Sequence, residues 1–532
     1  MSGVNGPTAA DGPTSGQAEL SPPIADWPGL ARANARAAEA WAFQVAGRSA
    51  CDVRLLARRE AREAAARFSA KLGVEVAAPS SPDALIVATG HQPELYHSGV
   101  WVKDFALQSV GEALGATAID FVVDTDSFES VGMSTVCLTS GVHRCHQYLA
   151  VSAPDACFAT TPVPSEEDID GFCVAGRTLL STLPIHDPAE HFSAFCEQLR
   201  EASPSAENLA ELVTIARRRY EAPAGSTYLE LPVTSIVRGE AFAAFVADIG
   251  LSAERFADAY NTSLAEYRSA TKTRSAAQPF PDLARDESRV ELPLWLIAEG
   301  VRTTVWARSR PDGGATLLTE RGELVAELPA DGAGAATAAR TPLPGRALIA
   351  PKALALTLFT RLFACDLFIH GTGGGRYDRV TDDVCRRYFG VELPTFVVAT
   401  MTKLLPLGVP VATDEDVSAA KERLNRLEHN PDAMLADAEF LSAEERERGA
   451  ALSAEKSALV SAIAAPDADK KALGARIREV NAELATLLAP LRAQLTAQLA
   501  ELESERDAFE ILTDRTYPFC LFSPAEIAAT VR

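Results

Sequence analysis

The segment from Ala84 to Glu129 constrains the fold of this 532-residue chain more than any other, because it predicts a strand, a polar loop, a helix and a second strand in succession. The apolar run 84–88 does not alternate with polar residues, as expected of a parallel strand that is covered on both faces. A helical pattern follows over 100–114, and the segment Ile-Asp-Phe-Val-Val over 119–123 predicts the next strand. This βαβ order predicts a parallel sheet, whose ligands bind beyond the carboxyl ends of the strands.

Polar side chains follow both predicted strands, on the side where a ligand is expected. His91 and His97 lie in the first loop, where imidazoles can bind phosphate oxygens or act as general acid and base, although a lone histidine is more often structural. Asp124 and Asp126 come directly after the second strand and can share one face if it continues. They could bind a hydroxyl, an amine or Mg²⁺, or instead cap the next helix. We predict these four side chains as the catalytic residues.

A second strand, glycine-rich loop and helix occur together over 366–389. The loop from Gly371 to Asp378 lacks the Gly-Lys-Ser/Thr ending of a Walker A motif, and Arg376 occupies the position of the third glycine in G-x-G-x-x-G. Closely spaced glycines let backbone N–H groups approach an anion at a helix N-terminus, but they equally suit a tight turn that only packs the helix on the sheet. We predict that both loops line one pocket. The second loop would supply the cofactor-binding residues Gly371, Gly373, Gly374, Gly375 and Arg376.

The first loop also resembles the motif of a known family. Its sequence T-G-H-Q-P-E-L-Y-H-S-G-V-W-V-K-D resembles the T-G-Q-Q-x-x-L-x-x-G-P-x-x-x-x-K segment of the bacillithiol-biosynthesis cysteine-adding enzymes. The matching positions are Gly90, Gln92, Leu95, Gly99 and Lys103. His91 stands where the family has Gln, and Val100 where it has Pro.

This resemblance implies a fold, an activity and a set of ligands. The fold would be α/β, with a Rossmann-type parallel-sheet core that carries insertions, and an α-helical coiled-coil hairpin domain. The activity would join cysteine, or a similar amino acid, to an amino sugar or another amine, with an adenine nucleotide (ATP or ADP) and Mg²⁺ as candidate ligands. Gly90, Gln92, Gly99 and Lys103 would bind the cofactor, although a solvated lysine is the alternative at position 103. A non-catalytic nucleotide- or metabolite-binding protein that assembles through its coiled coil is the alternative function.

Composition excludes several other classes of protein. A formal net charge of −22 opposes a general affinity for nucleic acid. No apolar run approaches the roughly 18 residues that span a membrane, and the N-terminus lacks a secretion signal, so we predict a cytoplasmic protein without a membrane partner. The hydrolase elbow, the zinc-protease helix motif and the kinase signatures are also missing from the sequence.

The nine cysteines form no C-x-x-C pair, which favours reduced thiols over a disulfide framework. The closest group is Cys137, His143, Cys145, His146 and Cys157. These residue types can bind zinc, but their spacing lacks the paired knuckles of structural zinc sites. We therefore predict no metal site.

The pattern along the chain predicts six segments. They are a disordered leader (1–24), the first part of the core (25–150), an inserted connecting region (151–345), the second part of the core (346–412), a helical coiled-coil domain (413–512) and a C-terminal tail that docks on the body (513–532). In the helical domain Leu473, Ile477, Val480, Leu484, Leu487 and Leu491 follow heptad spacing. Such a seam needs a partner, either the helix over 443–463 or a second subunit, and we predict a homodimer through this region. Pro490 should kink the long helix.

Overall fold

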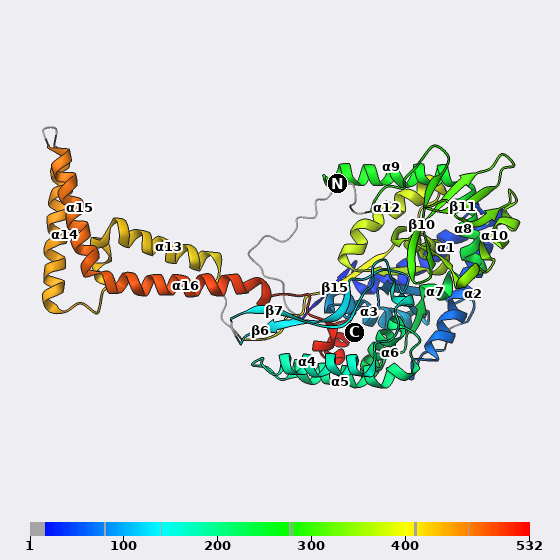
Figure 1. Ribbon diagram of the computed structural model, residues 1–532, viewed down its shortest axis with the longest axis horizontal. Coiled ribbons are helices and arrows are strands. Elements are labelled where there is room, and N and C mark those ends of the chain that lie inside the picture. Colours follow the sequence, from blue (N-terminus) through cyan, green and yellow to red (C-terminus); the bar gives the residue numbers. More distant parts are fainter. Residues whose placement is uncertain are drawn as a thin grey trace. The chain divides into compact units, whose positions relative to one another are not determined.

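The computed structural model describes residues 16–78, 81–139, 141–275, 278, 280–408, 412–465 and 468–531 (Figure 1). The described residues form two compact units. Unit 1 comprises the described parts of Met1–Thr135, Cys145–Leu404 and Arg515–Arg532, and unit 2 those of Val136–Arg144 and Leu405–Asp514. No helix in these ranges is long and apolar enough to cross a membrane.

A six-stranded sheet forms the centre of unit 1. In spatial order its strands are β1 (Ala18–Ser21), β15 (Val397–Met401), β14 (Leu367–His370), β4 (Ile86–His91), β5 (Thr117–Val122) and β8 (Leu229–Pro232). The last five are parallel, and β1 pairs antiparallel with β15 at the edge. The chain runs outward from β4 through β5 to β8, then returns to β14 on the other side of β4. The predicted α/β class with a parallel sheet is confirmed, and the winding direction reverses between β4 and β14.

Two of the predicted segments contain strands that belong to this sheet. Part of the predicted leader, Ala18–Ser21, is strand β1, because the edge of β15 offers backbone groups for it to pair with. Residues 1–15 of that leader lie outside the described residues. The predicted insertion over 151–345 contains β8, which is an integral strand of the parallel sheet. A strand of four residues is too short for periodicity alone to show which sheet it joins.

A second, five-stranded sheet is antiparallel throughout. Its order is β12 (Leu324–Leu328), β11 (Ala315–Thr319), β10 (Val301–Ser309), β9 (Val290–Ala298) and β13 (Leu348–Pro351). Strand β13 falls in the segment predicted as the second part of the core, but it pairs with β9 of this sheet. Two shorter sheets comprise β2 (Gln44–Val45) with β3 (Arg48–Ser49), and β6 (Ser130–Cys137) with β7 (His143–Val151).

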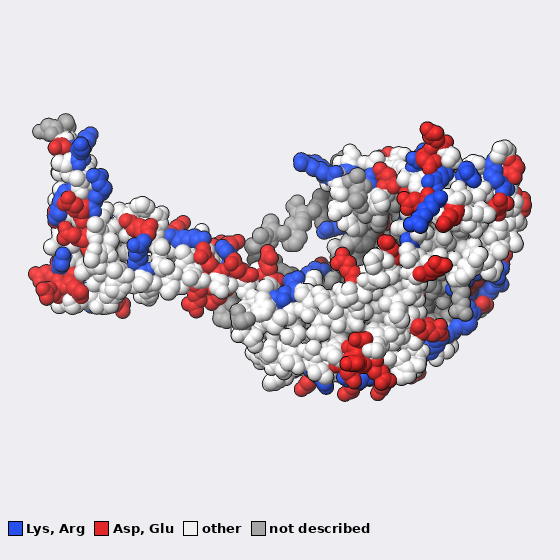
Figure 2. Space-filling view, viewed as in Figure 1, with Lys and Arg blue, Asp and Glu red and all other residues white. Residues whose placement is uncertain are grey.

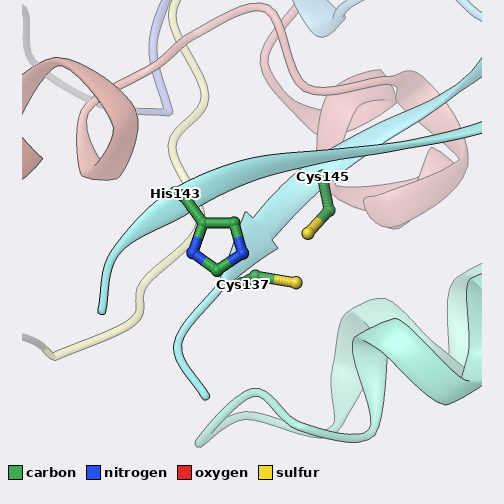
Figure 3. A group of neighbouring side chains, drawn as sticks. All are labelled: Cys137, His143 and Cys145. Carbon is green, nitrogen blue, oxygen red and sulfur yellow. The ribbon is translucent and has the colours of Figure 1, made fainter. Parts of the chain in front are cut away.

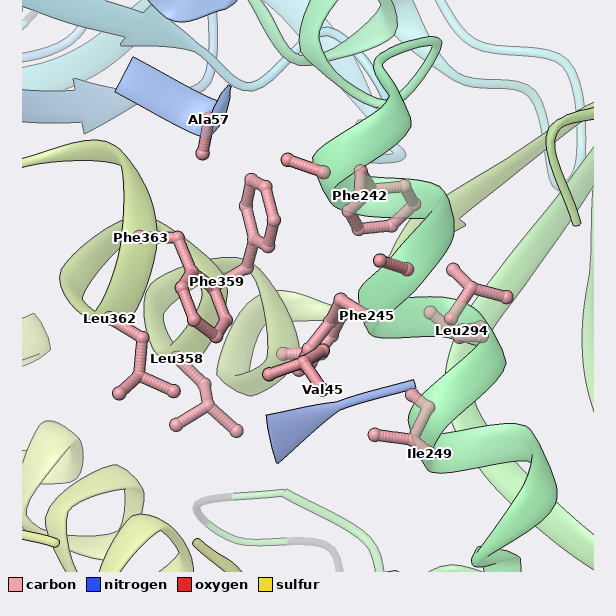
Figure 4. Close-up of a cluster of buried hydrophobic side chains, with 14 of the residues drawn as sticks. Val45, Ala57, Phe242, Phe245, Ile249, Leu294, Leu358, Phe359, Leu362 and Phe363 are labelled. Atoms are coloured by element: carbon pink, nitrogen blue, oxygen red, sulfur yellow. The ribbon is translucent and has the colours of Figure 1, made fainter. Parts of the chain in front are cut away.

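Helices surround the sheets of unit 1. They are α1 (Trp27–Glu39), α2 (Ala50–Ser69), α3 (Ser98–Leu114), α4 (Glu166–Leu180), α5 (Asp187–Ala202), α6 (Leu209–Glu221), α7 (Val233–Ile236), α8 (Glu240–Leu251), α9 (Ala253–Thr271), α10 (Gly332–Arg340), α11 (Ala353–Phe359), α12 (Thr372–Tyr388) and α17 (Pro524–Ala529). The main core contains Phe242 and Phe245 of α8, which pack against Phe359 of α11 with ring centroids 5.2 and 5.7 Å away (Figure 4). Arg54 of α2 is also buried, and its guanidinium pairs with Asp366 at 2.7 Å.

Of the tail predicted to dock on the body (513–532), the described residues from Arg515 onward belong to unit 1, and Thr513 and Asp514 belong to unit 2. Phe519 is fully buried, and its ring lies 5.4 Å from Tyr96 and 5.2 Å from Trp101. Its backbone N–H donates to the Tyr96 carbonyl at 2.8 Å. The tail therefore supports the beginning of α3 and the loop before it.

Unit 2 consists mainly of four helices, α13 (Asp414–His429), α14 (Ala443–Ile463), α15 (Lys470–Leu487) and α16 (Ala489–Leu512). Helix α14 packs beside α15, and α13 beside α16 (Figure 1). Leu452 of α14 meets Val480 and Leu484 of the predicted seam. Both acidic and basic side chains lie on the surface of these helices (Figure 2), and Arg476 pairs with Glu455 across them at 2.7 Å. Pro490, in the first turn of α16, marks the break between α15 and α16.

Candidate functional site

A cavity of about 490 Å³ lies in unit 1 at the carboxyl ends of β4 and β14. The first predicted loop contributes Gly90, His91, Gln92, His97, Gly99 and Lys103, and the second contributes Gly371, Gly373, Gly374 and Asp378. Both loops therefore line one cavity, as predicted. They meet because β4 and β14 are parallel neighbours, so their carboxyl ends lie side by side.

Two helices begin at this cavity. Helix α3 starts after His97, whose Nδ1 accepts the backbone N–H of Gly99 at 3.0 Å and so caps the helix. Helix α12 starts after Gly371 without a side-chain cap. The first N–H groups of a helix have no partner within the helix, and together with the helix dipole they attract anions. The start of α12 is therefore the better anion site of the two.

His91 and Lys103 share the buried side of the first loop. The Lys103 amine donates to the Gly90 carbonyl at 2.9 Å and is almost completely buried. Desolvation by burial lowers the pKa of His91 to about 3, so this imidazole is neutral at physiological pH. A neutral imidazole can accept a proton from a ligand or donate a single hydrogen bond.

Asp126 connects the cavity to the second sheet. Its carboxylate accepts from the Gln92 amide at 2.8 Å and from the Arg302 guanidinium of β10 at 2.8 Å. Arg302 also stacks on Trp295 of β9, with its guanidinium carbon 4.7 Å from the ring centroid. Gln92 and Arg302 are thereby held in fixed positions on the cavity wall.

Asp124 does not line this cavity, contrary to the expectation that both aspartates share one face. The chain turns after β5, and the Asp124 carboxylate accepts from the backbone N–H and the hydroxyl of Thr234 in the first turn of α7. It lines a separate cavity of about 570 Å³. Burial raises the pKa of Asp124 to about 6. The alternative considered for this residue was a cap on the next helix, whereas Asp124 binds the first turn of α7, 110 residues further along the chain.

Several predicted glycines have packing roles. A Cβ on Gly99 would come within 2.7 Å of the Met401 carbonyl oxygen, so α3 can approach β15 only with glycine there. A Cβ on Gly375 would lie 2.9 Å from Val398, and Gly375 does not line the cavity. Arg376 is exposed and is also absent from the lining, because its position on α12 points it away. Gly375 and Arg376 therefore do not lie at the cavity with the other predicted cofactor-binding residues.

Sequence reasoning missed a histidine and carboxylate pair at the same cavity. His370, the last residue of β14, places its Nε2 2.7 Å from the Asp378 carboxylate, which also binds Arg361 at 2.6 Å. Burial alone would raise the pKa of Asp378, but the Arg361 charge and His370 lower it to about 2. The sequence pattern that could have indicated this pair is a polar residue at the end of a buried strand, followed by an acidic residue two helical turns later.

A buried ionic network lies behind the first loop. Arg217 of α6 binds Asp104 at 2.9 Å, Asp120 at 3.0 Å and Glu230 at 2.6 Å. Burial and the neighbouring Asp120 raise the pKa of Asp104 to about 8. These side chains connect α3, β5, α6 and β8, and they hold the Lys103 segment of α3 in place.

The hairpin of β6 and β7 brings together three members of the predicted cysteine and histidine group (Figure 3). The ligand atoms of Cys137, His143 and Cys145 lie within 4.8 Å of one another. Cys137 and Cys145 are disulfide-bonded, contrary to the expectation that all nine cysteines are reduced, and the other seven are free. Cross-strand proximity, which spacing alone does not reveal, makes this pairing feasible. Metal binding would require both as thiolates.

Compared with known protein families, the chain matches no family model, and no curated protein matches it.

Proposed function

We propose that unit 1 is a Rossmann-type domain and that its cavity is the active site of an amide-forming ligase. The enzyme would join a cysteine-like amino acid to an amino sugar or another amine. The supporting observation is the convergence of both loops at the point where the winding of the sheet reverses. Taken in chain order, the five parallel strands follow the 3-2-1-4-5 arrangement of dinucleotide-binding sheets, which bind ligands at this point.

The roles within the cavity follow from charge and hydrogen bonding. The uncapped start of α12, with Gly371, Gly373 and Gly374, would hold an anionic group such as the phosphate of an adenine nucleotide. Neutral His91 would accept the proton that the attacking amine releases. Asp126 is already engaged by Gln92 and Arg302, so we assign it to positioning them. Mg²⁺ would enter with the nucleotide, bound mainly through its phosphates.

The test uses the purified full chain. Mass spectrometry of retained small molecules identifies the ligand class, and turnover is then measured with cysteine, ATP and a panel of amino sugars. We expect an ATP-dependent amide product. Arg515→Ala, which removes a cationic side chain from the cavity lining, should lower turnover, whereas Arg376→Ala, on α12 close to the glycines but outside the cavity lining, should not. A retained ligand without any amide product would favour the metabolite-binding alternative.

For unit 2 we propose a coiled-coil hairpin formed by α14 and α15. The supporting contacts are those of Leu452 with Val480 and Leu484, at positions of the heptad seam. The seam has a partner within the chain, so a second subunit would have to use other surfaces of these helices.

A further inference from the structure

The Lys103 amine is an unusual group in this cavity. Its side chain is 3% exposed, it lines the cavity, and its Nζ donates to the Gly90 carbonyl at 2.9 Å. Within the described part of the chain, no carboxylate lies within ion-pair distance of this amine. The nearest acids are Asp104 and Asp120, and both are bound to Arg217. Lys103 is therefore a buried amine beside a cavity, without an ion-pair partner.

Burial without a partner favours the uncharged amine. Moving an ammonium group out of water costs several kcal/mol unless a counter-charge compensates it. Desolvation lowers the pKa of Lys103, and the charge of Arg217 acts in the same direction, while Asp104 and Asp120 oppose them. His91, the other titratable group beside it, is neutral and contributes no compensating charge. An uncharged amine has a free electron pair and is a nucleophile.

The rest of the cavity suits a small anionic partner. The uncapped start of α12 attracts anions, and the exposed Arg515 adds a positive charge that no described carboxylate neutralises. Arg302, in contrast, is matched by Asp126. The wall between these groups is largely apolar and aromatic, with Phe280, Trp295 and Phe368 among its members. A compact carboxylate fits this distribution of charge better than a cation does.

We propose that Lys103 forms an imine with a 2-oxo acid bound in this cavity. The amine nitrogen bonds to the carbonyl carbon, and the carbonyl oxygen leaves as water with the two hydrogens of the amine. The carbon–nitrogen double bond replaces the carbon–oxygen double bond, so no oxidant or reductant takes part. The acid group of the ligand is held by the start of α12, and neutral His91 relays the hydrogens of the amine to the departing oxygen.

Reductive trapping tests this inference on the full chain. Glyoxylate is added with cyanoborohydride at pH 7, and the modified lysine is identified by peptide mass spectrometry. We expect Lys103 to be labelled at least about tenfold faster than the exposed lysines, because each unit of lowered pKa gives tenfold more neutral amine. Lys103→Arg should lose this label, whereas Lys352→Arg, which replaces an ion-paired lysine next to the cavity, should keep it. Labelling confined to exposed lysines such as Lys272 would overturn the inference.

A second measurement on the unmodified chain covers the case in which Lys103→Arg does not fold. Between pH 7 and pH 9 the neutral fraction of an exposed lysine rises roughly a hundredfold. The neutral fraction of a buried amine with a lowered pKa rises less over the same range. The ratio of Lys103 labelling to labelling of exposed lysines should therefore fall steeply as the pH rises. A constant ratio would overturn the inference. Neither measurement uses ATP or an amine acceptor, so its outcome is separate from that of the ligase test.

Discussion

At the scale of single residues, neighbouring side chains of the same type have separate tasks. His97 caps α3 through the Gly99 N–H, whereas His91 lies beside the buried Lys103 amine. Replacing His97 would therefore remove a helix cap, a loss of about 1 kcal/mol, in addition to any effect on a ligand. Asp124 and Asp126 are likewise separated, one to each of two cavities. Within each pair, a substitution of one residue can therefore serve as the control for the same substitution of the other.

Asp126→Asn should weaken ligand binding, because the neutral amide binds Arg302 less strongly and releases it and Gln92 from fixed positions. We expect at least about a tenfold loss of affinity, equivalent to 1.4 kcal/mol, measured by calorimetry with the ligand found by mass spectrometry. Asp124→Asn is the matched control, and it should change the melting temperature through the contact with Thr234 while leaving affinity unaltered. Equal effects of both variants on affinity would contradict the assignment.

His91→Gln should make the free energy of unfolding less dependent on pH. The folded-state pKa of His91 is about 3, below the ordinary value of 6.5. As the pH falls, His91 is therefore protonated at a higher pH in the unfolded chain than in the folded chain. This contribution to stability is present above pH 6.5 and is lost as the pH falls toward 3. Between pH 7 and pH 5 the unmodified chain should lose up to about 2 kcal/mol that the variant retains. Urea unfolding at both pH values measures the difference, and identical pH dependence of the two chains would refute it.

At the scale of elements, the site is built from the starts of two helices and the ends of two parallel strands. Helix α3 is held tightly, because it is capped by His97, packs through Gly99 against β15, and is covered by Phe519 of the tail. Helix α12 is anchored one turn further along, where Asp378 binds Arg361 and His370. Its first turn has no side-chain cap and borders the cavity. The two helix starts therefore differ in what they can offer a ligand.

Alanine at Gly99 and at Gly373 should separate packing from binding. At Gly99 the new methyl group would overlap the Met401 carbonyl oxygen, so we expect a loss of about 1 to 3 kcal/mol in unfolding free energy. At Gly373 nothing lies within 4 Å of the added Cβ, and stability should stay within about 0.5 kcal/mol. Ligand affinity should nevertheless fall for Gly373→Ala, because this residue lines the cavity. Thermal unfolding and calorimetry provide the two readouts, and unchanged affinity would argue against an anion at this helix start.

At the scale of the whole molecule, unit 1 contains the cavity and unit 2 has hydrophobic clusters of its own. The heptad seam of unit 2 meets a helix of the same chain, so it does not leave the large apolar face from which a dimer was inferred. Val460 and Phe509 nevertheless remain exposed by 52% and 45% on other sides of these helices. Association through unit 2 stays a prediction, which now depends on these outer surfaces.

Light scattering should find the full chain as a homodimer at micromolar concentration and a deletion variant as a monomer. The variant replaces residues 414–512 by a short Gly-Ser linker, which is feasible because α13 and α16 lie side by side. It should keep the ligand affinity of the full chain, since the cavity lies in unit 1. A monomeric full chain would refute the dimer, and a dimeric deletion variant would place the interface elsewhere.

The sequence by itself determined those features that depend on local patterns. Unbroken apolar runs indicated strands of the parallel sheet, glycine and histidine loops marked the carboxyl ends of β4 and β14, and heptad spacing indicated the seam of unit 2. Only the tertiary structure decided which local pieces meet. It brought Arg302 of the second sheet to Asp126, sent Asp124 to another cavity, paired His370 with Asp378, and left the Lys103 amine buried without a carboxylate. Periodicity encodes which face of an element is buried, whereas these contacts depend on strand order and chain reversal over hundreds of residues, which no local pattern contains.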